Sequence, residues 1–212
     1  MRSRPEHVSP IRTVVVDRLA EQLAPAGWRQ HRLVPDDEVA FVRAPSTEVV
    51  FHLSVNLAGD GGISLSPALG VEHAGIADLQ RELFRHTSTV CQVGATMGDL
   101  LREAATPKVT PLRWWVASPE RAEEVVAQVV ADLTTHGEPF LVDNQTLSAM
   151  IETLVGRPKS QVEYGTLAVC LAVSGDLPGA RAMLTKFDTE PRVFVGEVTQ
   201  RFIRTFRERF GE

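Results

Sequence analysis

Apolar side chains occupy every second position from residue 49 to residue 57, with polar side chains or Val50 between them, and this pattern constrains the fold more than any other feature of the chain. The apolar positions are Val49, Phe51, Leu53, Val55 and Leu57. The next five residues, 58–62, are rich in glycine and in residues that tolerate a positive φ, as a tight turn requires. We therefore expect a β-hairpin over residues 48–72.

One register gives this hairpin two unlike faces. On the apolar face it pairs Leu57 with Ile63, Val55 with Leu65, Leu53 with Pro67, Phe51 with Leu69 and Val49 with Val71. On the other face it pairs Asn56 with Ser64, Ser54 with Ser66, and His52 with Ala68. The second face is small and polar, so it is expected to be either solvent-facing or a docking surface.

The segments around the hairpin predict an antiparallel meander. Ser9 and Pro10 are a helix start, and apolar residues then follow helical spacing to Leu23, before Pro25 and Gly27. Two strand-like runs between residues 28 and 44 flank the acidic turn 35–38. A short helix is expected over 76–86 and a last strand over 112–117, whereas the apolar run 89–94 is ambiguous. The predicted sheet has about five or six strands.

After residue 118 every segment has a helical period and a start signal. Helices are expected from Ser118 to His136, from Asp143 or Asn144 to Gly156, over 160–174, over 176–187 and from Pro191 to the end. Ser160 with Glu163 forms a capping box for the third of these. The fold class is therefore α+β: an N-terminal helix with an antiparallel meander sheet in residues 1–117, followed by an all-helical half in residues 118–212. That half is expected to pack on the sheet or to form a small second lobe.

Residues 1–155 resemble a family of uncharacterised small bacterial proteins, some of which occur in toxin-immunity loci. The resemblance rests on the opening helix, Gly27-Trp28, the long hairpin, Arg113-Trp114-Trp115, a valine-rich helix and the segment 136–141. It implies that the chain neutralises a toxin by binding it.

A second resemblance covers residues 166–184. Here Leu167-Ala168, Ser174-Gly175-Asp176 and Ala180-Arg181-Ala182 resemble the turn of a tetratricopeptide-type helix pair. The chain has no second copy at a fixed period, so an array is not predicted.

Composition excludes some classes of function. The net charge of −5 argues against DNA or RNA as the main partner, because phosphate binding needs a concentrated positive surface. The chain has no apolar run long enough for a membrane span, and residues 1–6 lack the apolar core of a signal peptide, so we expect a cytoplasmic protein without a membrane partner. Cys91 and Cys170 are flanked by apolar residues and are expected to be two buried thiols.

Motifs for catalysis are weak. The Gly-x-Ser-x-Gly signature is absent, and the glycines at Gly94 and Gly98 lack the lysine of a phosphate-binding loop, so an ordinary turn before a helix is favoured and no cofactor is expected. A metal site can be drawn from Glu72, His73 and Asp78, but surface polar residues are the favoured interpretation. Glu48 opposite Glu72 indicates either a frayed hairpin end or a place for a cation or a partner's arginine.

Adjacent residues of a strand point to opposite faces, so only one of Trp114 and Trp115 can join the main core. The other is buried under a helical layer or belongs to a binding surface. The residues that we select for binding are His52, Ser54, Asn56, Ser64, Ser66 and Trp115, with no catalytic or metal-binding residue. They predict a non-enzymatic protein-binding module with a protein partner.

Three alternatives stay open. A small enzyme or ligand-binding protein would use His52, Ser54, Asn56 and Ser66 around a pocket between sheet and helices. A scaffold would recruit a peptide in a groove between the helices from Ser160 to Phe187. The last helix carries a phenylalanine stripe, which is core or a homodimer contact. On its opposite side lie Arg201, Arg204, Arg207 and Arg209, which form a solvated face or an anion or nucleic-acid site.

Overall fold

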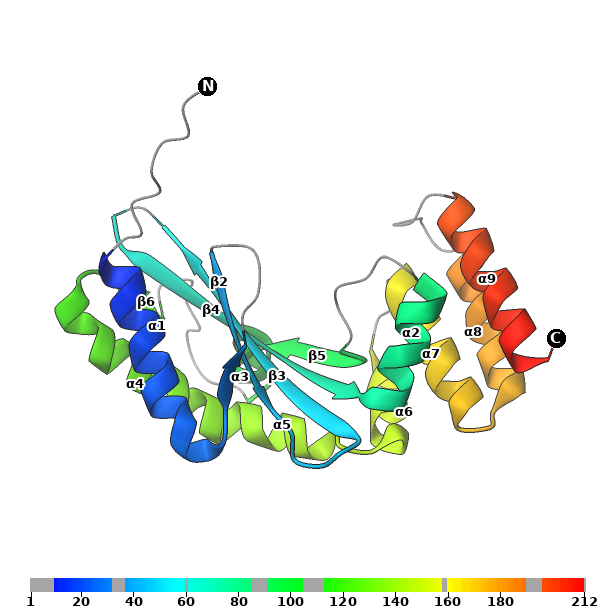
Figure 1. Cartoon of the computed structure of the whole chain (residues 1–212), viewed down its shortest axis with the longest axis horizontal. Coiled ribbons are helices and arrows are strands. Elements are labelled where there is room, and N and C mark those ends of the chain that lie inside the picture. Colours follow the sequence, from blue (N-terminus) through cyan, green and yellow to red (C-terminus); the bar gives the residue numbers. More distant parts are fainter. Residues whose placement is uncertain are drawn as a thin grey trace, which may run out of the picture. The chain divides into compact units, whose positions relative to one another are not determined.

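The structure, a computed structural model, describes residues 10–31, 37–59, 61–84, 91–104, 113–157, 160–189 and 196–211 (Figure 1). The strands are β1 (Arg29–His31), β2 (Glu38–Arg43), β3 (Val49–Ala58), β4 (Ile63–His73), β5 (Val93–Thr96) and β6 (Trp115–Val116). The α-helices are α1 (Pro10–Leu23), α2 (Ala74–Phe84), α3 (Met97–Glu103), α4 (Ala122–Asp132), α5 (Glu138–Asp143), α6 (Leu147–Gly156), α7 (Gln161–Val173), α8 (Leu177–Thr189) and α9 (Gly196–Phe210). Short 3₁₀ turns at Ala24–Ala26 and Pro119–Arg121 and a π-helical turn at Leu133–Gly137 complete the described elements.

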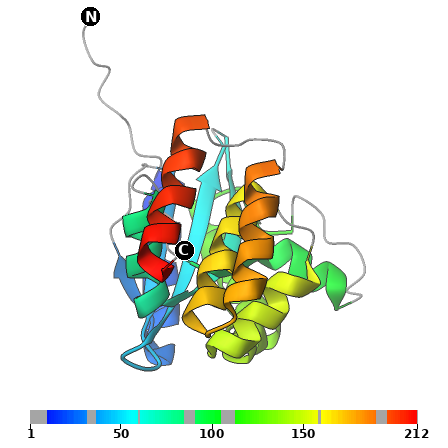
Figure 2. The same ribbon diagram turned by 90° about the vertical axis from the view of Figure 1, so that its right-hand side faces the viewer.

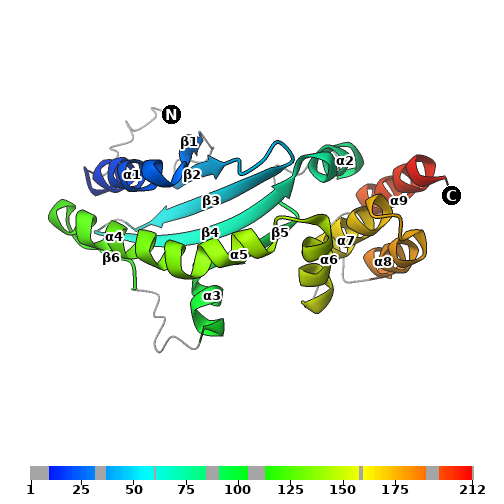
Figure 3. The same ribbon diagram turned by 90° about the horizontal axis from the view of Figure 1, so that it is seen from below.

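The strands form one sheet in the order β1-β2-β3-β4-β5, with β6 also paired to β4 (Figure 3). The pairs β1–β2, β2–β3 and β4–β6 are antiparallel. An N-terminal helix, an antiparallel sheet and a helical C-terminal half confirm the predicted α+β class.

The predicted two faces of the hairpin are present. The apolar residues of β3, from Val49 to Leu57, are buried, and every residue between them is half-buried. In β4, Ile63, Leu65, Pro67, Leu69 and Val71 are buried as well. The period of two in the sequence therefore reports the core face of the sheet correctly.

The described chain divides into two compact units that interleave in sequence. Unit 1 comprises residues 1–43, 51–69 and 95–141, and unit 2 comprises residues 44–50, 70–94 and 142–212. The long strands β3 and β4 contribute residues to both units. The helix α4, which follows residue 118, belongs to unit 1 together with most of the sheet.

In unit 1, α1 and α4 pack against each other and against one face of the sheet (Figure 1). The buried stripe of α1, with Val15, Leu19 and Leu23, has the spacing of one helix face. Arg43 on β2 forms an ion pair with Glu138, and its guanidinium lies 4.8 Å from the ring centroid of Trp28. These contacts fix the strand β2 and the turn after α1 in the same unit.

The predicted helix end at His136 and Gly137 is wrong. The chain continues through the π-helical turn into α5. Gly137 is buried there, and a Cβ on it would lie 2.7 Å from atoms of both Leu133 and Leu69, so this glycine allows close packing instead of capping the helix. Pro139 has no N–H to donate to the preceding turn, which accounts for the irregular hydrogen bonding at this position.

In unit 2, α2, α7, α8 and α9 pack around a cluster of phenylalanines. The ring centroids of Phe84 and Phe202 are 4.4 Å apart, and those of Phe187 and Phe202 are 4.6 Å apart. Phe202 and Phe206 are fully buried, so the middle of the predicted stripe on α9 is core, whereas Val198 and Phe210 of the same stripe are partly exposed. Phe194 and the predicted helix start at Pro191 lie outside the described residues.

Helix boundaries in unit 2 follow capping chemistry. The predicted capping box is present, with Ser160 Oγ accepting from Glu163 N and Glu163 Oε2 accepting from Ser160 N. The predicted cap at Asp143 or Asn144 is wrong, because Thr146 caps α6 by accepting from Ala149 N. Gly175, at a φ of 92°, makes the predicted turn between α7 and α8. Among the described helices, none is long and apolar enough to cross a bilayer.

Candidate functional site

The six residues selected from the sequence lie on one face of the sheet in unit 1. His52, Ser54 and Asn56 on β3 alternate with buried residues of the core face. Ser64 and Ser66 do the same on β4. Trp115 on β6 lies directly opposite Ser64, while its neighbour Val116 lies opposite the buried Ile63. The structure therefore brings all six to the face that points away from α1 and α4, which we call the polar face.

Two further strands extend the polar face. On β2, Glu38 lies opposite Asn56, Ala40 opposite Ser54 and Val42 opposite His52. On β1, His31 lies opposite Ala40 and Arg29 opposite Val42. Arg29 and His31 are exposed, Glu38 and Val42 are partly exposed, and Ala40 is buried, so the face is open to solvent at its edges. Within the described residues of unit 1, no helix covers it (Figure 1).

The two adjacent tryptophans have opposite environments, as the strand geometry predicts. Trp114 is 6% exposed and lies on the core side, whereas Trp115 is 37% exposed on the polar face. In the described part of unit 1, Trp115 is the one exposed large hydrophobic residue. The alternative in which a second helical layer buries it does not hold within this unit.

The Trp115 indole rests on the turn between β3 and β4. A Cβ built on Gly62 would lie 2.4 Å from Trp115 Cζ2, and one built on Gly59 would lie 3.6 Å from Trp115 Cη2. The absence of a side chain at Gly62 is therefore what lets the ring approach the main chain. The glycine-rich turn, which the sequence predicts, is therefore also the surface on which the aromatic ring packs.

Asp132 on α4 holds the segment that carries both tryptophans. Its Oδ2 accepts from Trp114 Nε1 at 2.9 Å and from Arg113 Nε at 3.0 Å. Its Oδ1 accepts from Arg113 Nη2 at 2.7 Å and from Gln128 Nε2 at 3.0 Å. Burial alone would raise the pKa of Asp132, but these hydrogen bonds and the Arg113 charge outweigh burial and hold the pKa below its usual value. Asp132 is thus an ionised anchor beneath β6.

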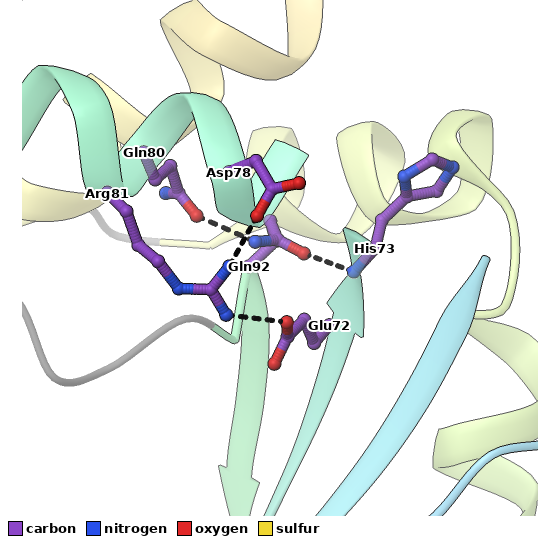
Figure 4. Close-up of polar contacts among 6 residues, drawn as sticks. All are labelled: Glu72, His73, Asp78, Gln80, Arg81 and Gln92. Atoms are coloured by element: carbon purple, nitrogen blue, oxygen red, sulfur yellow. Dashed lines mark hydrogen bonds and ion pairs between the residues drawn. The ribbon is translucent and has the colours of Figure 1, made fainter. Parts of the chain in front are cut away.

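A second polar cluster lies in unit 2, where β4 meets α2 (Figure 4). Arg81 Nη2 contacts Glu72 Oε1 at 3.0 Å, and Arg81 Nη1 contacts Asp78 Oδ1 at 2.6 Å. The positive charge beside Glu72 is therefore an arginine of the same chain, so the alternative of a bound cation or a partner's arginine there gains no support. Among the described residues, no group of three or more His, Cys, Asp and Glu side chains is placed to hold a metal, so the metal site drawn from Glu72, His73 and Asp78 is not formed.

Next to this ion pair a chain of amides runs through the interior of unit 2 (Figure 4). Gln92 Oε1 accepts from His73 N at 2.6 Å, and Gln92 Nε2 donates to Gln80 Oε1 at 2.6 Å. Gln80 Nε2 in turn donates to Thr166 Oγ1 at 2.8 Å. Gln80, Gln92 and Thr166 are each buried. The chain ties β4, the segment before β5, α2 and α7 together, so it is structural.

Neither cysteine has the environment of a nucleophile. Burial, reinforced by the charge of Glu72, raises the pKa of the Cys91 thiol to about 12. Burial likewise raises the pKa of Cys170 to about 12. Both are free thiols; Cys170 is buried, as predicted, whereas Cys91 is partly exposed. A Cβ on Gly70 would lie 2.5 Å from Cys91 Sγ, so this thiol fills a packed position.

A groove of about 300 Å³ lies in unit 2 between α8 and α9. None of the six selected residues lines it. The small-molecule alternative needs a pocket around His52, Ser54, Asn56 and Ser66. This groove is lined by other residues, so it does not support that alternative. The scaffold alternative placed a groove between α7 and α8, whereas the groove found here is formed by α8 with α9.

Asp132, Gln80 and Gln92 were not predicted from the sequence. A signal was present for Asp132, because it follows Val125 and Val129 at the spacing of the buried stripe of α4. A carboxylate in an apolar stripe must be paired. The glutamines gave no comparable signal, since their partners are distant in sequence. Comparison with protein-family models, curated proteins and solved structures found no match.

Proposed function

We propose that this chain is a non-enzymatic protein-binding module that docks a partner protein on the polar face of unit 1. The observation that carries the proposal is the position of Trp115, which is 37% exposed on a sheet face while its neighbour Trp114 is buried. Tryptophan is enriched among the residues that dominate binding energy at protein interfaces. Trp115 is the anchor of the proposed contact.

The surroundings of Trp115 suit an interface. Serine and asparagine side chains from β3 and β4 present hydroxyl and amide groups without bulk, so a partner can approach the sheet closely. The indole is seated on Gly62 and its strand is held by Asp132, so little side-chain freedom is lost on binding. A rigid aromatic group ringed by small polar groups is the arrangement that a binding surface needs.

The resemblance of residues 1–155 adds a class of partner to this proposal. Some proteins with this pattern occur in toxin-immunity loci, and the partner that we propose is accordingly a protein toxin. Docking on the polar face would neutralise it. This role depends on the resemblance, whereas the location of the contact depends on Trp115.

The test is an affinity pull-down from the native cell lysate with the full chain and three variants. Trp115→Ala removes the anchor, and Ser54→Arg places a bulky charge on the same face. Val155→Ala is the matched control, because Val155 is an apolar residue that is 58% exposed in unit 2. We expect a stoichiometric partner with the wild type and with Val155→Ala, and its loss with the other two variants. Equal capture by Trp115→Ala, or no partner with any form, contradicts the proposal.

A further inference from the structure

The strand β1 forms one edge of the sheet in unit 1, and the proposed contact at Trp115 does not use this edge. β1 pairs with β2 on one side, and no other described strand pairs with it (Figure 3). Its residues Arg29, Gln30 and His31 are all exposed. In an edge strand, alternate residues turn their N–H and C=O groups away from the sheet, where another strand can pair with them. β1 therefore offers main-chain hydrogen bonds to a partner.

The start of β1 is held in place by the residues before it. Gly27, at a φ of 83°, turns the chain out of the 3₁₀ turn, and the next residue, Trp28, is 3% exposed. The guanidinium of Arg43 lies 4.8 Å from the ring centroid of Trp28 and donates to Ala26 O at 3.3 Å. A strand that is already fixed loses little conformational freedom when another strand pairs with it.

Arg29 and His31 give this edge its chemical character. Both lie on the polar face. Within the described residues, neither side chain has a hydrogen bond or an ion pair. The arginines that line the groove between α8 and α9 (Figure 2) differ, because Arg181 and Arg207 each have an interaction within the chain already. The edge of β1 is thus a place where a guanidinium and an imidazole are available to a partner.

These two side chains select the charge of an added strand. Directly opposite residues of neighbouring strands have Cβ atoms about 5 Å apart, so an added strand would bring its side chains against Arg29 and His31. A second copy of β1 would bring the same two side chains, which gives no attraction, whereas a carboxylate would be attracted. Glu38, on the same face of β2, lies one strand further away, at about 10 Å from an added strand. That is more than the Debye length at physiological salt, so Arg29 determines the charge preference at the edge.

The width of the polar face connects this edge to Trp115. Four strand spacings separate them, from β1 through β2, β3 and β4 to β6, which amounts to about 19 Å. A standard protein–protein interface covers about 800 Å² of each partner, which is a patch about 28 Å across. A partner protein that is centred on the polar face and contacts Trp115 therefore also reaches β1.

We infer that an extended segment of the partner protein pairs with β1 as an added strand and places a carboxylate against Arg29 and His31. The inference rests on the proposed function for the identity of the partner, and it adds the chemistry that the partner presents at one side of the contact. Main-chain hydrogen bonds along β1 supply the pairing, and the carboxylate supplies the specificity.

Amide chemical shifts of the full chain, measured by NMR with added peptide, test the inference. The probe is a short extended peptide in which glutamate alternates with valine, so that all its carboxylates lie on one face. One reference probe has lysine in place of each glutamate, and a second has N-methyl groups that remove its main-chain donors. The edge variant is Arg29→Glu. The matched control is Arg204→Glu, because Arg204 is also an exposed arginine but lies on α9 in unit 2.

We expect the glutamate probe to shift the amides of residues 29–31, and its affinity to fall about fivefold or more with Arg29→Glu. The lysine probe and the N-methylated probe should bind more weakly than the glutamate probe by a similar factor. Unmoved amides in β1, equal binding of either reference probe, or undiminished binding by Arg29→Glu would overturn the inference. So would an equal loss with Arg204→Glu, since the effect would then be one of general charge.

The same measurement separates this inference from the proposed function. Trp115→Ala should bind the glutamate probe as the wild type does, because Trp115 lies at the other side of the sheet. If the pull-down finds no partner while the amides of β1 shift as expected, the proposed function is contradicted and strand pairing at β1 is supported. If a partner is captured through Trp115 while β1 fails these tests, the proposed function holds and the inference is wrong.

Discussion

The carboxylate of Asp132 accepts a hydrogen bond from the indole nitrogen of Trp114 at 2.9 Å, beneath the strand β6. This contact determines more than the position of one buried ring. Because neighbouring residues in a strand point to opposite faces, holding Trp114 on the core side directs Trp115 to the polar face. A partly buried ion pair in unit 1 thus orients the exposed residue on which the proposed interface depends.

Replacing Asp132 with asparagine should destabilise the chain by about 3 kcal/mol at neutral pH, because it removes the charge that pairs with Arg113 and puts an NH2 donor in place of one of the two oxygens that accept from Arg113 and Trp114. Glu124→Gln is the control. Glu124 pairs with Arg121 on the surface, and its loss should change the stability by less than about 0.5 kcal/mol. Urea denaturation measures both; equal effects would show that the Asp132 network contributes no more than a surface pair.

The same carboxylate predicts a pH dependence. The pKa of Asp132 is lowered in the folded chain, so its contribution to stability is complete above the unfolded value of about 3.9 and is lost as the pH falls below it. Urea midpoints measured from pH 6 downward should fall more steeply in this range for the wild type than for Asp132→Asn. Parallel curves would contradict the lowered pKa.

Alanine at Gly62 should displace the Trp115 ring, because the new Cβ would lie 2.4 Å from Trp115 Cζ2 and 2.9 Å from Val116 O. We expect a loss of about 2 kcal/mol and a changed indole fluorescence. Gly61→Ala is the control, since nothing lies within 4 Å of a Cβ there. An unchanged emission spectrum in Gly62→Ala would mean that the ring is not seated on the turn.

Gly165 on α7 allows the phenylalanine cluster of unit 2 to close. A Cβ there would lie 2.8 Å from Phe84 Cζ and 3.1 Å from Phe187 Cδ2. Overpacking should outweigh the better helix propensity of alanine, so Gly165→Ala should lower the stability by about 1 kcal/mol. Gly156→Ala at the end of α6 meets no atom within 4 Å and should raise it by about 0.5 kcal/mol. Thermal melts distinguish the two signs.

The buried amides should behave as a coupled set. Gln80→Leu removes the acceptor of Gln92 and the donor to Thr166 and should cost about 2 kcal/mol. Thr166→Val removes the other end of the second bond. Because both variants disrupt one shared hydrogen bond, the double variant should cost less than the sum of the two. Additive losses in a double-mutant cycle would show that the bond carries no coupling.

Both thiols should resist a thiol reagent in the folded chain. The pKa of Cys91 and that of Cys170 are about 12, against about 8.5 in an unfolded chain, so few thiolates form at pH 8. The stability linked to these groups is complete below about pH 8.5 and declines as the pH rises above it. Labelling with a chromogenic disulfide should require denaturant; rapid native labelling of Cys91 would contradict its raised pKa.

The sequence predicted those parts of the fold that depend on local periodicity. Alternation identified both faces of β3 and β4, and the pairing of Ser160 with Glu163 located the start of α7. The same period placed His52, Ser54 and Asn56 on one face. Adjacent residues of a strand point to opposite faces, so one of Trp114 and Trp115 had to lie on the polar face, and Trp115 is the one that does.

The rest depends on contacts between distant segments. The bond from Gln80 to Thr166 joins residues far apart in the chain, and no local pattern reports it. Gly137 looked like a helix cap because glycine usually ends helices, yet tertiary packing against Leu69 and Leu133 keeps it inside one. Predicting the groove between α8 and α9 would require knowing which helices are neighbours, and the sequence does not show this.

The two units interleave in sequence, and this limits how the protein can be divided into fragments. Each unit is assembled from three separate stretches of sequence, and the strands β3 and β4 pass from one to the other. Dividing the chain after residue 117 would separate α4 from the larger part of the sheet, so neither fragment would contain a complete unit. Point variants of the intact chain, not truncations, are therefore the means of testing the roles of its surfaces.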